Sequence, residues 1–62
     1  MLSSGDLRVF RGYPDTGAWN VMRYNLVLGT WGTQVSGLRT EREAIREARR
    51  LARATWGRYN PA

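Results

Sequence analysis

The chain has 62 residues, of which 42% are apolar and 24% are charged, and it contains neither cysteine nor histidine. This length allows one small domain, residues 1–62, whose core must form without disulfides or a His/Cys metal site. Ten basic residues, all arginine, oppose five acidic ones and give a formal net charge of +5. The composition therefore favours an anionic partner, and it predicts neither a metal ion nor a cofactor.

The residue types also argue against catalysis. Without histidine the chain lacks the usual general base near neutral pH, and without cysteine or lysine it lacks a thiolate or Schiff-base nucleophile. The carboxylates are Asp6, Asp15, Glu41, Glu43 and Glu47. They would form a catalytic pair only if distant segments converged. We therefore expect a non-enzymatic binding domain with no small-molecule substrate.

No targeting or membrane segment is evident. The first residues lack a basic patch followed by an apolar run, and the longest unbroken aliphatic stretch is Leu26-Val27-Leu28. We expect a cytoplasmic protein that makes no membrane contact.

Alternation of side-chain character predicts a first strand over residues 7–13. Leu7 and Val9 would lie on one face of this strand, and Arg8 and Phe10 on the other. The residues before it, 1–6, are expected to fray.

Two reversals and two more strands follow. Residues 14–17, Pro-Asp-Thr-Gly, are typical of a turn, because proline presets the backbone angle and glycine accepts a positive φ. The turn predicts a hairpin with a second strand over residues 18–28. Residues 29–32 predict a second reversal that exposes Trp31 as a contact residue, and residues 33–36 a third strand.

A capped helix is the clearest local signal. Thr40 and Glu43 match a capping box, and apolar residues at helical spacing continue the pattern over residues 41–56. Gly57 stands where a left-handed residue would end the helix. Residues 58–62 are expected to fray. The predicted core face of the helix consists of Ala44, Ile45, Ala48, Leu51, Ala52 and Thr55.

These elements predict an α+β fold in which a three-stranded antiparallel sheet packs on one C-terminal helix. The side chains predicted to face the helix are Leu7, Val9, Trp19, Val21 and Val35. The opposite, outer face of the sheet would carry Arg8, Phe10, Asn20, Met22, Tyr24, Gln34 and Ser36.

Half of the arginines fall within a sector of about 100° on the predicted helix. They are Arg42, Arg46, Arg49, Arg50 and Arg53. At three-residue spacing, Glu43 can pair with Arg46 and Glu47 with Arg50. Two interpretations stay open: a solvated helix face, or a surface that binds phosphates.

The outer sheet face also has more than one interpretation. Its arginine, amide and aromatic side chains suit contact with nucleic-acid bases. Equally, its apolar residues could bind a protein partner or a second copy of the chain, or the face could simply be solvated.

The order strand, turn, strand, strand, capped helix, with Thr40-x-x-Glu43-Ala44 opening an Ala/Arg-rich helix, resembles a group of DNA-binding domains. These three-stranded-sheet domains occur at the amino end of tyrosine recombinases and in plant ethylene-response factors. The likeness covers residues 7 to 56 and is architectural. It implies that the sheet enters the major groove and that Arg8, Arg11 and Arg23 contact DNA. This chain differs in carrying more arginine on the helix than on the sheet.

The leading hypothesis is a small basic domain that binds nucleic acid, duplex DNA in particular. The arginines expected to contact it are Arg8, Arg11, Arg23, Arg42, Arg46, Arg49 and Arg53. The alternative is a protein-interaction or inhibitor module, including a homodimer. It would use Phe10, Met22, Tyr24 and Trp31.

Overall fold

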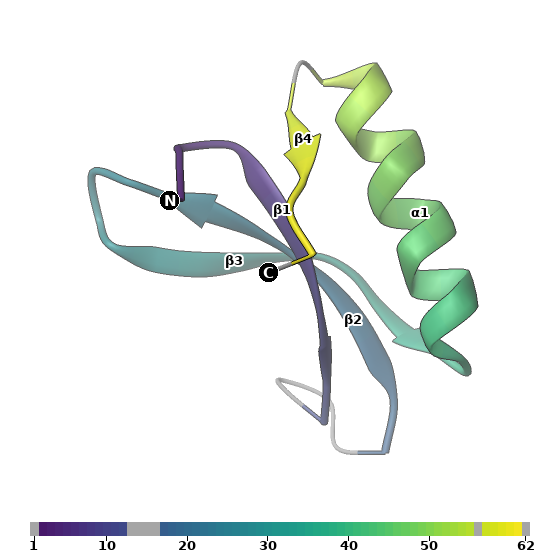
Figure 1. Cartoon of the computed structure of the whole chain (residues 1–62). Helices are drawn as coiled ribbons and strands as arrows, with labels where there is room; N and C mark the ends of the chain where they lie inside the picture. Colours follow the sequence, from purple (N-terminus) through teal and green to yellow (C-terminus); the bar gives the residue numbers. More distant parts are fainter. Residues whose placement is uncertain (1, 13–16, 56, 62) are drawn as a thin grey trace.

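The computed structural model describes residues 2–12, 17–55 and 57–61. One helix packs on a mixed four-stranded sheet (Figure 1). The elements in chain order are β1 (Asp6–Arg11), β2 (Trp19–Asn25), β3 (Thr30–Leu38), α1 (Glu41–Ala54) and β4 (Arg58–Tyr59). The α+β class and the helix on the sheet are confirmed. The prediction of a purely antiparallel, three-stranded sheet is wrong.

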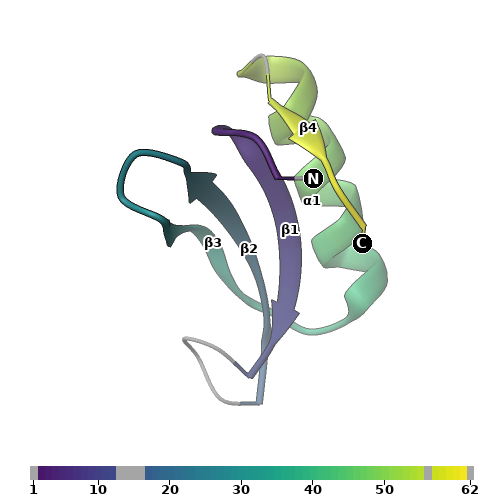
Figure 2. The same cartoon turned by 60° about the vertical axis from the view of Figure 1, so that its left-hand side comes forward.

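The fourth strand is the main departure. The sheet order is β3-β2-β1-β4, and β4 pairs with β1 in parallel, placing Asp6 opposite Arg58 and Leu7 opposite Tyr59 (Figure 2). The amide of Asn60 extends this pairing by donating to the carbonyl of Leu7 at 2.8 Å. The parallel direction follows because α1 carries the chain back along the sheet, as a helical crossover does. The expectation that residues 58–62 fray is therefore wrong for Arg58, Tyr59 and Asn60.

The predicted hairpin between the first two strands is confirmed. β1 and β2 are antiparallel, with Val9 opposite Val21. The first strand begins at Asp6, which is buried, so the predicted fraying does not extend to this residue. Residues 13–16, which include most of the predicted turn, lie outside the described residues, as does Trp56 at the predicted helix end.

The second strand is shorter than predicted and the third is longer. β2 ends at Asn25, whose side-chain Oδ1 accepts from the Leu28 amide at 3.1 Å and whose carbonyl accepts from the Gly29 amide at 2.7 Å. Gly29 has a φ of 66°, which the tight turn needs and glycine adopts without strain. The extension of the strand to Leu28 is therefore wrong. Trp31 lies within β3, so its predicted turn position is wrong too.

Irregular pairing with β2 changes which β3 side chains face outward. Val21 lies opposite Val35, but the next residue, Met22, lies opposite Thr33, so Gln34 is an extra residue on β3. Such bulges reset the side-chain alternation. Gln34 consequently contacts Arg23, at 3.4 Å, and the Thr33 hydroxyl reaches the sulfur of Met22 at 3.5 Å.

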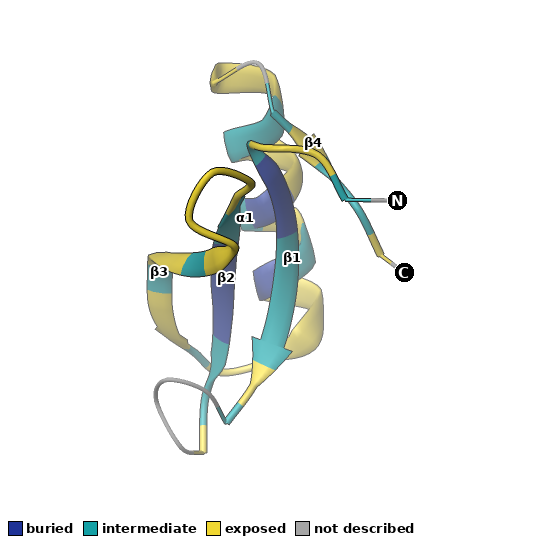
Figure 3. Cartoon of the chain, turned by 90° about the vertical axis from the view of Figure 1, so that its left-hand side faces the viewer, coloured by how far each residue is buried: buried dark blue, intermediate teal, exposed yellow. Residues whose placement is uncertain are grey.

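The core lies between α1 and the sheet. Leu7 and Val21 are fully buried against Ala44 and Ala48, whose short side chains let the helix approach closely (Figure 3). The predicted assignment of apolar strand residues to the helix side is confirmed. Half-buried residues that complete the core are Val9, Trp19, Val35, Leu38, Leu51, Ala52 and Tyr59.

The predicted N-cap is confirmed. The Glu43 amide donates to Thr40 Oγ1 at 3.1 Å, and the Thr40 hydroxyl donates to Glu43 Oε1 at 3.4 Å. Replacing Thr40 with alanine leaves a first-turn amide without its acceptor. We expect Thr40→Ala to lower the free energy of unfolding by about 1 kcal/mol in urea denaturation. A Thr40→Ser variant should keep the cap, and equal losses in both variants would contradict this role.

Gly57 has a different role from the one predicted. The helix ends at Ala54, two residues before the predicted end. The amide of the C-cap residue Thr55 donates to the Leu51 carbonyl at 2.9 Å, and Gly57 has no positive φ. A Cβ at Gly57 would lie 2.6 Å from the backbone oxygen of Gly5. Glycine is needed here because the chain entering β4 passes this close to the start of β1.

We expect Gly57→Ala to destabilise the fold by about 1–3 kcal/mol, the usual cost of overpacking. Gly32 supplies the control, because a Cβ there meets nothing nearer than the Arg23 carbonyl oxygen at 4.0 Å. Thermal denaturation should show a lower melting temperature for Gly57→Ala than for Gly32→Ala. The reverse order would show that the close approach at Gly57 is unimportant.

Candidate nucleic-acid interface

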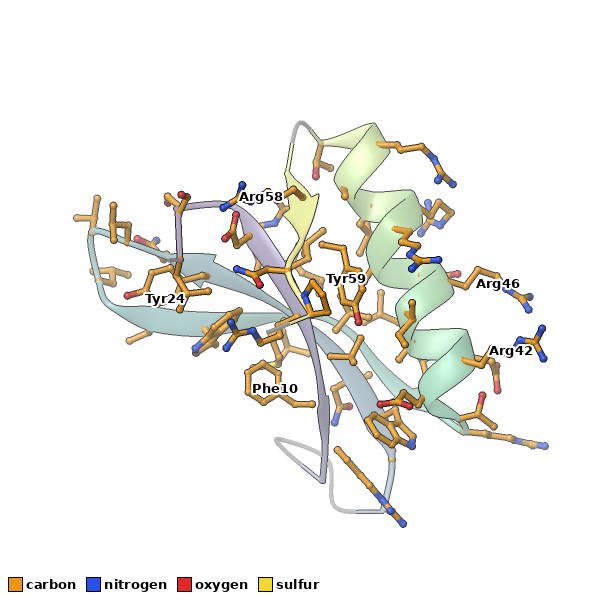
Figure 4. The ribbon with its side chains drawn as sticks, in the orientation of Figure 1. Phe10, Tyr24, Arg42, Arg46, Arg58 and Tyr59 are labelled. Atoms are coloured by element: carbon orange, nitrogen blue, oxygen red, sulfur yellow. The ribbon has the colours of Figure 1, made fainter. Side chains whose placement is uncertain are left out.

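Four arginines line one exposed side of α1. Arg42, Arg46, Arg49 and Arg53 border a shallow depression on the helix together with Ile45 and Glu41, and we call these four residues the arginine stripe. Figure 4 shows Arg42 and Arg46 pointing away from the sheet. Helical spacing alone brings these side chains together, so this part of the predicted site is assembled as expected.

Most of the stripe lacks an internal partner. Arg50 pairs with Glu47 at 2.9 Å, as predicted. The predicted Glu43–Arg46 pair does not form, because the Glu43 carboxylate turns back to the Thr40 hydroxyl. Among the described residues, no side chain forms an ion pair or hydrogen bond with Arg42, Arg46 or Arg53. Three guanidinium groups are therefore available to an external anion.

Arg49, the fourth residue of the stripe, contacts the aromatic ring of Tyr59. Its guanidinium carbon lies 5.7 Å from the centre of the Tyr59 ring. This cation–π contact restrains the side chain and leaves its charge in place. The stripe is thus tied at this point to β4.

The helix tolerates its own like charges because its ends are favourably charged. Neighbouring arginines four residues apart repel by a few tenths of a kcal/mol per pair. Glu41 and Glu43 in the first turn and Arg53 in the last turn interact favourably with the helix dipole. The Thr40 cap stabilises the same helix, so α1 can present a concentrated positive charge.

The sheet arginines are not gathered with the stripe. Arg8 lies 5.6 Å from the Trp31 ring centre and donates to the Asn60 carbonyl at 3.2 Å. Arg11 lies 5.9 Å from the Trp19 ring. Arg23 donates to Thr55 Oγ1 at 2.6 Å, at the end of α1. These three predicted contact residues therefore occupy three separate environments.

The outer face of the sheet carries an aromatic cluster, which we define as Phe10, Tyr24 and Trp31. The Trp31 ring centre lies 5.1 Å from that of Phe10, edge to face, and 5.1 Å from that of Tyr24. Trp31 is half-buried, and Met22 is only 2% exposed. The prediction that Met22 is an exposed contact residue is therefore wrong.

A buried carboxylate ties both ends of the described chain together. Asp6 accepts hydrogen bonds from the Ser3 amide at 3.1 Å, Arg58 Nε at 3.2 Å and Asn60 Nδ2 at 3.3 Å. Burial raises the pKa of Asp6, but the hydrogen bonds from Ser3 and Asn60 and the charge of Arg58 outweigh it. The net result is a pKa below the ordinary value of 3.8. This site joins β1 to β4 and holds Arg58 and Asn60 beside the start of β1.

Within the described residues, no helix has the length and apolar character needed to cross a bilayer. No family model matches the sequence, and comparisons with curated proteins and with solved structures find no similar protein. The resemblance to the three-stranded-sheet DNA-binding domains therefore stays a prediction, and a functional argument must rest on the residues themselves.

Proposed function

We propose that the chain is a small nucleic-acid-binding domain that holds the phosphate backbone of duplex DNA along the arginine stripe. The observation that carries this proposal is the set of exposed guanidinium groups on one side of α1, three of them without an internal partner among the described residues. Such groups bind phosphate through paired hydrogen bonds in addition to charge.

The dimensions of the stripe fit a duplex. Arg42 and Arg53 are eleven residues apart, which corresponds to about 16 Å along the helix axis. Duplex DNA carries one negative charge for about every 1.7 Å of its axis, so phosphates lie within reach of the whole stripe. Its major groove, about 12 Å wide, also admits an α-helix.

The surroundings of the stripe favour a duplex over a single strand. Proteins that bind single strands commonly place aromatic side chains beside a basic groove, so that exposed bases can stack. α1 contains no aromatic residue, the Tyr59 ring beside Arg49 is half-buried against the core, and the aromatic cluster lies on the sheet face turned away from the helix. A helix side on which guanidinium groups outnumber carboxylates suits backbone contact, which positions a protein without reading sequence.

The salt dependence of binding tests the proposal. We would measure fluorescence anisotropy of a labelled DNA duplex with the full chain. Four phosphate contacts predict a slope of about −3.6 for log affinity against log salt, or a fall of about 150-fold between about 50 and 200 mM salt. No binding at the lower salt concentration, or a slope near zero, would overturn the proposal.

A further inference from the structure

One continuous part of the chain contains no charge. Residues 24–38 have no acidic or basic side chain, although charged residues make up 24% of the chain. This segment, which we call the neutral arm, comprises the end of β2, the turn after it and the whole of β3. The β2–β3 hairpin extends from the sheet on the side away from α1 (Figure 1). The arginine stripe on α1 therefore lies away from the tip of this hairpin, and the arginine beside the neutral arm, Arg23, comes from β2.

The tip of the neutral arm is apolar and exposed. Leu26, Val27 and Leu28 are 58%, 92% and 70% exposed. Turns at hairpin tips are normally built from polar residues and glycine, and three consecutive exposed aliphatic residues are unusual in a folded chain. The turn is fixed by hydrogen bonds from the Leu28 and Gly29 amides to Asn25, so its exposure is built into the fold. Such a patch marks a contact surface.

The backbone beside the tip is also unpartnered. β3 is an edge strand, and it contains neither proline nor a charged residue, the usual protections of a sheet edge. The irregular pairing with β2 affects residues 34–37, where a bulge disrupts the edge. Residues 30–33 pair in regular register with β2. Their outward backbone groups can therefore pair with another strand.

We propose that a second copy of this chain pairs with residues 30–33, in antiparallel direction, so that the two sheets become continuous. The charge distribution favours a second copy of the chain as the partner at this edge. Two chains of net charge +5 repel each other, and contact through the neutral arms keeps the arginine stripes at the far ends of the pair. The same strand segment on each copy makes a self-complementary interface, as a two-fold dimer requires.

The apolar tip fits this arrangement. With the two-fold axis at Gly32, antiparallel pairing sets Trp31 of each copy opposite Thr33 of the other, so the exposed tip lies beside the neighbouring β3 beyond Gln34, towards Val35. Val35 is half-buried at the margin of the core. The tip would thereby cover the apolar margin of the neighbouring copy. Among the described residues the buried apolar side chains are Leu7, Val21, Met22, Ala44 and Ala48, and so small a core benefits from such an addition.

An anionic membrane is a poorer fit for the same tip. A hairpin that inserts into such a surface needs basic residues beside its apolar tip. In this chain the arginine stripe lies on α1, at the opposite end from the tip (Figure 4), and Arg23, which lies near Leu28, donates to Gln34 and Thr55. The dimer does not depend on the proposed DNA binding, because none of the stripe residues takes part in it.

Sedimentation velocity of the full chain without nucleic acid tests the dimer. We expect the mass to rise with concentration from 7.1 kDa towards twice that value. Val27→Glu places a charge on the exposed tip, and Gly32→Lys places one on the regular edge, where a Cβ meets nothing nearer than 4.0 Å. Both variants should stay monomeric.

Ala54→Glu is the matched control, because it adds the same charge as Val27→Glu at an exposed position on α1. It should associate as the wild type does. Val27→Glu lowers the net charge and Gly32→Lys raises it. Loss of dimerisation in both variants would therefore show that the neutral arm, and not the net charge, is responsible. Circular dichroism confirms that each variant is folded. A wild type that stays at 7.1 kDa at every concentration, or arm variants that associate normally, would overturn the proposal.

Discussion

Replacing Arg42 and Arg46 together with glutamine is expected to weaken duplex binding and to flatten its salt dependence. Each lost phosphate contact removes about 0.9 from the slope of log affinity against log salt. With two of four contacts left, the affinity should fall only about 12-fold between about 50 and 200 mM salt, against about 150-fold for the wild type. Anisotropy titrations at several salt concentrations measure this difference directly.

The matched control removes the same charge elsewhere. Arg11 and Arg39 are both exposed and lie outside the stripe, so the double change Arg11→Gln with Arg39→Gln should keep the wild-type slope. Equal flattening in both double variants would mean that the stripe does not by itself govern binding. Because Arg11 belongs to the sheet arginines that the family resemblance implicates, the control also tests that prediction.

Asp6→Ala is expected to produce the largest loss of stability. The buried Asp6 carboxylate accepts hydrogen bonds from the Ser3 amide, Arg58 and Asn60, and the alanine variant removes this shared, charged acceptor. Hydrogen bonds to a charged group contribute about 1.5–3 kcal/mol, so we expect a loss of about 2–3 kcal/mol. A domain of this size has a total stability of only about 3–9 kcal/mol. Urea denaturation measures the loss, and a change below about 0.5 kcal/mol would show that the site is not structural.

The same carboxylate predicts a pH dependence. Its pKa is lower in the folded chain than the ordinary 3.8, so the folded state favours the deprotonated form. The stability that it contributes is present above the ordinary pKa and is lost as the pH falls through the lower, folded value. Asp6→Asn lacks this titration, so the difference in stability between wild type and Asp6→Asn should shrink on acidification. A constant difference down to about pH 2 would contradict the lowered pKa.

Local patterns predicted the helix and the first hairpin. Thr40 with Glu43 set the helix start, and the helical spacing of Ala44 and Ala48 identified its buried face. Alternation in β1 likewise separated core from outer residues. The arginine stripe was predictable for the same reason, because positions on one helix face depend only on helical geometry.

The remaining features depend on contacts between distant residues. β4 has two residues, too few for a detectable pattern, and it forms because Arg58 and Asn60 reach Asp6 from 52 and 54 residues away. Residues 26–28 have the composition of a strand, but Asn25 folds them into a turn. The bulge at Gln34 reset the alternation along β3. The sheet arginines diverge because each finds a different tertiary partner.

The central claim, that DNA contacts the arginine stripe, is tested most directly by NMR during a titration with duplex DNA. Arginine side-chain Nε–Hε signals and the Trp31 indole signal report on the two faces of the molecule separately. The account predicts that the largest shifts occur at Arg42, Arg46 and Arg53, with the Trp31 indole little changed. Shifts concentrated on the Trp31 indole and Arg8, with the stripe unaffected, would contradict it.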